Sequence, residues 1–176
     1  MSAIDLIILG KVQEHPVSAY ELVHILESQN LNRWVKISSQ GVYRNITILH
    51  EKGYLEGKQV KEGNMPEKTV YSITQKGMDH FYKLMGDIAS TLDNFYFNFN
   101  AVIANIDKVD KEAGLRYLET IRTKIYESKG QINANYEFRK DHLPYYGVAI
   151  IELYHEIFNT VLVEWIDKFI DRYRKM

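Results

Sequence analysis

The 176-residue sequence contains no cysteine, only three prolines and only ten glycines. The lack of cysteine excludes disulfide bridges, zinc fingers, iron–sulfur clusters and thiol catalysis, and it is compatible with a cytoplasmic protein. No run of about 18 apolar residues is present, so we expect no segment to cross a membrane. Because proline and glycine are scarce, the sequence favours long helices with few tight turns.

A strong overall charge is also lacking. The chain has 22 basic and 23 acidic residues, so its formal net charge of −1 does not attract it to nucleic acid. The segment 36–76 differs, because its seven basic residues outnumber its four acidic residues. Any binding to nucleic acid must therefore use a local patch. The length and the 45% apolar content fit one large globular domain or two small ones.

Two helices are predicted near the N-terminus. Residues 4–13 are apolar enough for a short buried helix, which Pro16 ends because it biases the preceding residue away from helical geometry. Ser18 and Glu21 then form an S-x-x-E capping box for a second helix that ends near Ser28.

A third helix and a β-hairpin follow. Ser38 and Ser39 both offer an N-cap for this helix. The β-rich segments 54–56 and 69–73 flank a polar stretch with glycine and proline, which predicts a hairpin with a long tip. Thr74 caps one more helix. The order helix, helix, helix, hairpin, helix is that of a winged helix-turn-helix, a mainly α fold with a small β-hairpin wing.

The third helix, which Gly53 ends, has two different faces. Val42, Ile46 and Leu49 are spaced as one buried stripe. The opposite face carries amide, hydroxyl and guanidinium groups of the kinds that contact bases and phosphates. Together with the basic wing, this face predicts a set of DNA-binding residues: Ser39, Gln40, Tyr43, Arg44, Thr47, Lys58, Lys61 and Lys68. The alternative interpretation is a plain amphipathic helix beside a solvated hairpin.

The second half of the chain is predicted to be helical. We expect a helix over 93–106, a long helix that Asp110 caps, a break at Pro144, and a final helix from about Tyr145 to Tyr173. The sequence therefore predicts a DNA-binding domain over 1–86 and a helical dimerisation domain over 87–176.

The final helix predicts an oligomer. Its apolar residues surround most of the helix, so it needs cover on most sides, and a domain of this size provides little. A two-fold homodimer is the default form of cover, and burial within one chain is the alternative. The residues expected at the dimer contact are Ile157, Phe158, Val161, Leu162, Trp165 and Phe169.

Three segments of the first half resemble the PadR family of bacterial transcriptional regulators. They are ILGKVQEHPVSAYELVHIL with the Trp34 that follows it, SSQGVYRNITILHEKGYL, and PEKTVYSITQKG, which lie within residues 4–78 in the family's order. The helix layout of the second half and Trp165 resemble the longer subgroup with an extended helical C-terminal domain. The resemblance implies a homodimeric repressor that binds double-stranded DNA at an inverted-repeat operator.

Several positions depart from the family pattern. Arg44 stands where proline is usual, Gly41 where a small hydroxyl residue is frequent, and Thr47 and Ile48 replace a basic pair. The DNA-facing surface thus keeps Tyr43 but carries its basic charge elsewhere, so the operator read here can differ from the family's usual one.

Some relatives in the family release DNA when a phenolic acid or an aromatic drug binds, so the resemblance raises a small aromatic effector as a candidate ligand here. Seventeen of the 22 aromatic residues lie from Phe81 onward, enough to line a pocket. The candidate effector-binding residues are Phe95, Tyr96, Phe99, Tyr145 and Tyr146, with Phe95, Phe99 and Val102 expected on one helix face. The same rings can instead form core and dimer contacts.

Motifs of catalysis are missing. The chain has no nucleophile elbow, Walker loop or dinucleotide fingerprint. Glu152 and His155 have the spacing of a helical metal pair, but a di-iron bundle needs two such pairs and two more glutamates. We therefore expect a regulator with no catalytic residue, metal or cofactor. The alternatives are a winged-helix module that binds protein or RNA, and an enzyme with a metal at Glu152 and His155.

Overall fold

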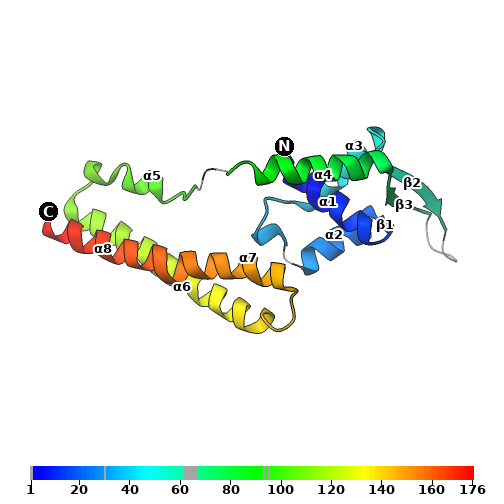
Figure 1. Cartoon of the computed structure of the whole chain (residues 1–176). Coiled ribbons are helices and arrows are strands. Elements are labelled where there is room, and N and C mark those ends of the chain that lie inside the picture. The colour runs from blue at the N-terminus through cyan, green and yellow to red at the C-terminus, as the bar shows by residue number, and fades with distance from the viewer. Residues whose placement is uncertain (1, 30, 62–66, 93, 95) are drawn as a thin grey trace. The chain divides into compact units, whose positions relative to one another are not determined.

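Figure 1 shows the computed structural model of the chain, which describes residues 2–29, 31–61, 67–92, 94 and 96–176. The chain divides into two compact units, Met1–Asn94 and Phe95–Met176. The first unit is a winged helix-turn-helix and the second consists of long helices (Figure 1), which confirms the predicted fold class. Among the described residues, no helix is long and apolar enough to cross a membrane.

The first unit forms the helices that the sequence predicts. The capping box at the start of α2 is present: the Glu21 amide donates to Ser18 Oγ at 3.3 Å, and the Ser18 amide donates to Glu21 Oε2 at 2.9 Å. This reciprocal bonding satisfies two amides that a helix start leaves unpaired. The helices of this unit are α1 (Ala3–Glu14), α2 (Ala19–Ser28), the 3₁₀ turn η1 (Leu31–Arg33), α3 (Ser39–Glu51) and α4 (Gln75–Ala89).

Both ends of α3 are set by local sequence. Ser38 Oγ accepts a hydrogen bond from the Gly41 amide at 3.1 Å, so Ser38 is the N-cap. At the other end Gly53 has a φ of +73°, a left-handed conformation that glycine adopts without a Cβ penalty. The two predicted boundaries of this helix are confirmed.

The wing sheet contains β1 (Val17–Ser18), β2 (Leu55–Val60) and β3 (Lys68–Ile73) in the order β1-β3-β2. Strands β2 and β3 pair antiparallel from Leu55 opposite Ile73 to Val60 opposite Lys68. The strand β1 was not predicted, because two residues are too few to show an alternating pattern. The predicted hairpin tip at 62–66 lies outside the described residues.

The core of the first unit holds α3 by one face. Val42, Ile46 and Leu49 are each at most 2% exposed and pack with Ile8 and Leu22 of the neighbouring helices. Burial of such a side chain contributes roughly 1.5–3 kcal/mol. The predicted stripe is therefore the anchor of α3, and it leaves the opposite face to solvent.

The second unit contains the predicted long helix and the predicted final helix. Asp110 caps α6 by accepting a hydrogen bond from the Ala113 amide at 2.8 Å. The final helical run includes a π-helical turn, η3, that the sequence pattern does not indicate. The elements are α5 (Asn100–Ile103), the 3₁₀ turn η2 (Ile106–Lys108), α6 (Lys111–Arg139), α7 (Tyr145–Glu156), η3 (Ile157–Val161) and α8 (Leu162–Lys175).

The predicted helix over 93–106 is wrong for most of its described part. Only Asn100–Ile103 is α-helical there, and Phe99 is its N-cap rather than a member of a helical face. The rings of Phe97 and Phe99 stack with centroids 5.0 Å apart, and Phe99 stacks on Trp165 at 5.5 Å. Packing of these rings onto the core competes with helix formation in a segment rich in asparagine, which has low helix propensity. Asp93 and Phe95 lie outside the described residues.

Packing of α6 against α8 forms the core of the second unit. Leu118, Ile121 and Ile125 of α6 are buried with Leu162, Ile166 and Ile170 of α8. At the surface, Asp167 of α8 accepts hydrogen bonds from Arg122 Nε at 2.7 Å and from the Tyr126 hydroxyl at 2.9 Å. Apolar and ionic contacts therefore join the two helices along the same side of α6.

Candidate nucleic-acid interface

The outward face of α3 presents the predicted DNA-binding side chains. Gln40, Tyr43, Arg44 and Thr47 are exposed, whereas the residues between them are buried against α1 and α2. The Tyr43 side chain keeps 44% of its surface accessible. Because the other face is anchored in the core, these groups project from a helix whose position is fixed.

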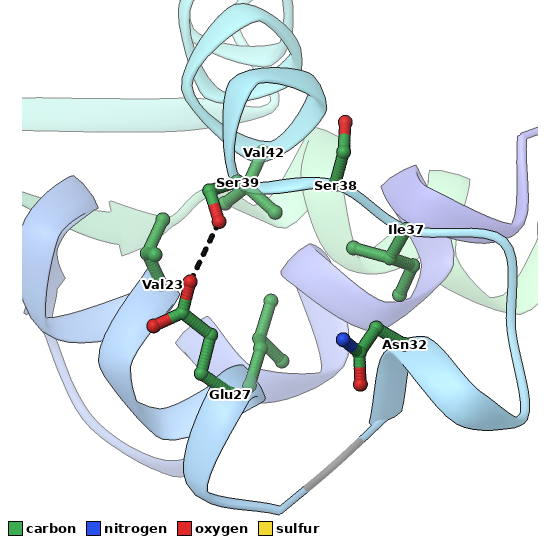
Figure 2. Close-up of a pocket in the computed structure, with 8 residues that line it drawn as sticks. Val23, Glu27, Asn32, Ile37, Ser38, Ser39 and Val42 are labelled. Atoms are coloured by element: carbon green, nitrogen blue, oxygen red, sulfur yellow. Dashed lines mark hydrogen bonds between the residues drawn. The ribbon is translucent and has the colours of Figure 1, made fainter.

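The start of α3 is joined to the end of α2. Ser39 Oγ donates a hydrogen bond to Glu27 Oε1 at 2.7 Å, drawn as the dashed line in Figure 2. The two residues border a small cavity of about 70 Å³ that Asn32, Ile37 and Val42 also line. Ser39, a predicted DNA contact, is thus bonded to a carboxylate in this structure.

One residue of α3 has an environment that the sequence pattern did not indicate. Asn45 is 8% exposed, and its amide Nδ2 donates to Asp5 Oδ1 at 2.7 Å and to Ser2 Oγ at 3.4 Å. The signal available in the sequence is its position: Asn45 lies three residues after Val42 and one before Ile46, inside the buried stripe. A polar residue at a buried helical position needs a partner, and the N-terminal turn of α1 supplies it.

The wing lysines have different environments. Lys58 on β2 and Lys61 beyond its end are exposed. Lys68 is partly buried, and its ammonium lies 2.9 Å from Glu21 Oε1 at the start of α2. This hydrogen bond from Lys68 and those from Ser18 lower the pKa of Glu21 from 4.5 to about 2. Lys68 therefore holds the wing to α2, and Lys58 and Lys61 present their charge to solvent.

Lys76, another basic residue of the segment 36–76, also has a structural partner. Lys76 Nζ donates to the carbonyl oxygen of Lys52, the C-cap of α3, at 2.7 Å, and lies 5.1 Å from the centre of the Tyr54 ring. A cation at this place satisfies a carbonyl and opposes the partial negative charge of the helix end. The exposed basic side chains of α3, its C-cap and the wing are therefore Arg44, Lys52, Lys58 and Lys61.

These features coincide with a known family. The profile described as "Transcriptional regulator PadR-like family" matches residues 8–83, which include α2, α3 and the wing. Over these residues the chain belongs to the PadR-like family. It is therefore a DNA-binding transcriptional regulator with a winged helix-turn-helix, and the expectation that it is not an enzyme is confirmed by this membership.

Solved structures share the PadR-like fold over nearly the whole chain. The crystal structure of Bacillus subtilis PadR with operator DNA has a TM-score of 0.81 at 13% identity and covers 98% of this chain and 99% of that chain. The same protein with p-coumaric acid has a TM-score of 0.76 at 11% identity, with coverage of 99% and 98%. The Vibrio cholerae virulence activator AphA has a TM-score of 0.73 at 17% identity, covering 99% of both chains. No curated protein sequence matches the chain.

In the second unit of this PadR-like protein, one candidate effector residue, Phe99, lines a cavity. The cavity measures about 320 Å³ and lies between α6, the segment before α5 and the start of α8. Tyr96, Tyr145 and Tyr146 are exposed and do not line it, and Phe95 lies outside the described residues. The lining residues are Phe97, Phe99, Thr120, Ile121, Lys124, Ile125, Ser128, Phe158 and Leu162.

The predicted dimer residues lie on η3 and α8. Leu162 is buried within the chain, and Ile157, Phe158, Trp165 and Phe169 are partly buried against the same core. Val161 is exposed. Val161 belongs to a more exposed apolar stripe on the same helical run, which also contains Tyr146, Ile150 and Leu153. We refer to these four residues as the exposed stripe.

Among the described residues, the metal pair considered as an alternative has no third ligand. Glu152 is exposed, and the His155 ring packs on Tyr136 at a centroid distance of 5.2 Å. Within the described part of the chain, no three His, Asp or Glu side chains are close enough to hold a metal ion.

Proposed function

We propose that this PadR-like regulator is a cytoplasmic repressor that binds an inverted-repeat operator as a homodimer. In this proposal residues 1–86 bind DNA through α3 and the wing, and residues 87–176 dimerise. The observation that carries it is the exposed face of α3, where Tyr43 and Arg44 project from a helix anchored on its other side. Bacillus subtilis PadR, which shares the fold, has been crystallised with operator DNA.

The contacts follow from the chemistry of each group. Arg44 can donate two hydrogen bonds to a guanine, and Gln40 can pair with an adenine. Tyr43 and Thr47 can donate hydroxyl hydrogen bonds to phosphate, and Lys58 and Lys61 neutralise phosphates beside the groove. Ser39, at the start of α3, adds a further phosphate contact once its hydrogen bond to Glu27 is released.

The test uses a duplex that the wild-type protein enriches from a randomised library. Tyr43→Ala and Arg44→Ala are each expected to weaken binding to this duplex by about 1–3 kcal/mol, because each removes a direct contact without removing core. Tyr82→Ala and Arg172→Ala are matched controls, since both side chains are exposed on other helices. Unchanged affinity for both α3 variants at fixed salt would reject the assignment.

Salt dependence separates this function from the alternative of a protein-binding winged helix. A DNA-binding protein loses affinity steeply as salt rises, because each neutralised phosphate releases counterions. If the wild-type protein enriches no sequence and binds duplex DNA without a salt slope, the interaction module is the better proposal.

The homodimer is supported by the exposed stripe. Exposed apolar residues that follow one helical face are typical of surfaces that a partner covers, and a two-fold dimer places the same face of both chains together. In this arrangement the predicted dimer residues Ile157, Phe158 and Leu162 support the dimer contact indirectly. They pack against α6 and hold η3 in position.

Release by an aromatic effector is supported by the cavity of about 320 Å³. Phe97, Phe99 and Phe158 provide an apolar lining, and Thr120, Lys124 and Ser128 of α6 also line the cavity. The Lys124 ammonium lies 2.7 Å from Glu127 Oε2, so an acidic ligand would compete with Glu127 for it. A planar aromatic acid fits this combination, because its ring can stack on phenylalanine and its carboxylate can pair with a lysine. Bacillus subtilis PadR has been solved with such a compound, p-coumaric acid.

Titration with p-coumaric acid tests the effector proposal. Trp165 stacks on Phe99 at the edge of the cavity, so its fluorescence is expected to change on binding in a Trp34→Phe background. The same titration is expected to release the enriched duplex. Lys124→Met removes the charge that holds the carboxylate and is expected to weaken both responses. Release without a change in Trp165 emission would place the effector elsewhere, and no response would reject it.

A further inference from the structure

The buried amide of Asn45 links α1 to a residue of the DNA-binding face. Its Nδ2 lies 2.7 Å from Oδ1 of Asp5, in the first turn of α1, and 3.4 Å from Oγ of Ser2, the N-cap of α1. On the other side, Arg44 Nε donates to Asn45 Oδ1 at 3.5 Å, a bond longer than the roughly 2.7–3.2 Å usual for N–H···O. Asn45 therefore stands between the start of α1 and the guanidinium of Arg44.

The orientation of this amide is dictated by Asp5. A carboxylate only accepts hydrogen bonds, so the amide must turn its NH₂ group toward Asp5. The carbonyl oxygen of the amide then points the other way, where it can only accept. Arg44 Nε is a donor, and it lies on that side.

Asp5 is itself held in place. Its backbone amide donates to Ser2 Oγ at 3.2 Å, which is the N-cap bond of α1. The order Ser2, Asp5, Asn45, Arg44 thus runs from a helix cap to an exposed guanidinium. An apolar residue at position 45 would satisfy packing in the stripe of Val42 and Ile46, but it would leave Arg44 without this acceptor.

We propose that Asn45 is a positioning residue that orients the Arg44 guanidinium for DNA. This inference rests on the proposed function, because it takes Arg44 as a DNA contact. One Nε–H bond fixes the plane of the guanidinium and leaves its two terminal NH₂ groups directed outward, as bidentate pairing with a guanine requires. Asn45 does not touch DNA and acts through Arg44.

A double-mutant cycle tests the link. The four proteins are the wild type, Arg44→Ala, Asn45→Leu and the double variant, with affinities measured on the enriched duplex and on a scrambled duplex at fixed salt. Asn45→Leu is expected to weaken specific binding about tenfold and to leave non-specific binding nearly unchanged. In the Arg44→Ala background the same substitution is expected to cost less than twofold, because the residue it orients is gone.

A second variant separates an effect on fold stability from an effect on DNA binding. Asn45→Leu alone leaves Asp5 without its amide donor, whereas Asp5→Leu combined with Asn45→Leu removes both polar partners, which is close to neutral for stability. This pair is expected to unfold at nearly the wild-type temperature and still to show the tenfold loss of specific binding. Restored operator affinity in the pair, or an equal loss in the presence and absence of Arg44, would overturn the proposal.

The outcomes distinguish this inference from the proposed function. If the wild type binds no duplex in a salt-dependent way, or if Arg44→Ala has no effect, the proposed function has failed. If Arg44→Ala weakens specific binding and Asn45→Leu does not, only the positioning role has failed.

Discussion

Ser39 Oγ and Glu27 Oε1 lie 2.7 Å apart, and this hydrogen bond joins the first turn of α3 to the last turn of α2. The bond uses the hydroxyl of a residue expected to face DNA and places a carboxylate beside it. A phosphate that takes this hydroxyl must displace the carboxylate and approach its negative charge. Glu27 is therefore expected to weaken DNA binding in the native protein.

The Glu27→Gln variant tests this expectation. Loss of one negative charge about 4 Å from a phosphate is worth about 1 kcal/mol in water, so affinity for duplex DNA is expected to rise roughly fivefold at low salt. Screening reduces the gain as salt increases. Glu164→Gln on α8 is the matched control and is expected to change nothing. Weaker binding by Glu27→Gln would instead mean that the carboxylate holds Ser39 in its DNA-binding position.

The wing lysines are expected to differ in their roles. Lys58→Ala with Lys61→Ala is expected to weaken specific and non-specific DNA binding alike, and to reduce the salt slope by roughly 2 if both neutralise a phosphate. Filter binding across a salt series measures this slope. Lys68→Ala is expected to leave the slope nearly unchanged and to lower the unfolding temperature, because it removes the 2.9 Å ion pair with Glu21. A lowered slope for Lys68→Ala would make it a DNA contact.

Acid is expected to destabilise the first unit partly through Glu21. The pKa of this carboxyl is about 2 in the folded chain and 4.5 ordinarily, so the unfolded state binds the proton more readily. The stabilisation is complete above pH 4.5 and is lost as the pH falls from 4.5 toward 2. Because Glu21 is partly exposed to solvent, its contribution is about 1 kcal/mol.

Thermal unfolding of Glu21→Gln at several pH values measures this contribution. The variant is expected to be less stable than the wild type at pH 7, and the difference is expected to disappear near pH 2. A constant difference across this range would assign the loss to the shape of the cap rather than to its charge.

The exposed stripe is expected to carry the dimer contact. Leu153→Glu and Val161→Glu place a charge at the centre of a self-complementary apolar face, so each is expected to shift the protein toward monomer in sedimentation equilibrium. A monomer loses the linkage between two half-sites, which can reduce operator affinity by roughly 10² to 10⁴. Leu92→Glu, a change at an exposed leucine outside the stripe, is the control. Dimers of wild-type strength in both variants would place the interface elsewhere.

Two glycines of α4 are expected to respond in opposite ways to alanine. A Cβ on Gly77 would lie 2.1 Å from the carbonyl oxygen of Tyr54, so Gly77→Ala must move α4 away from the wing and is expected to cost about 1–3 kcal/mol. A Cβ on Gly86 would meet nothing within 4 Å, so Gly86→Ala is expected to stabilise the helix by about 0.5–1 kcal/mol. Chemical denaturation compares the two. A stable Gly77→Ala variant would show that the helix start can shift freely.

Most of the helix boundaries could be predicted because their signals are local. The capping box of Ser18 and Glu21, the cap at Ser38 and the left-handed Gly53 each depend on residues within one turn. The segment 93–106 could not be predicted in the same way. There Phe97 stacks on Phe99 and Phe99 stacks on Trp165, a residue more than 60 positions away, so a distant contact decides the local backbone.

The sequence by itself determined the order of the helices and the hairpin in the first unit, the buried stripe of α3 and the face that this stripe leaves exposed, since periodicity and caps act over a few residues. Only the tertiary structure decided which polar groups are already engaged. Lys68 pairs with Glu21, Ser39 with Glu27 and Asn45 with Asp5 across 47, 12 and 40 positions of the chain. Hydrogen bonds act over about 3 Å in space, and separation along a sequence carries no record of that distance.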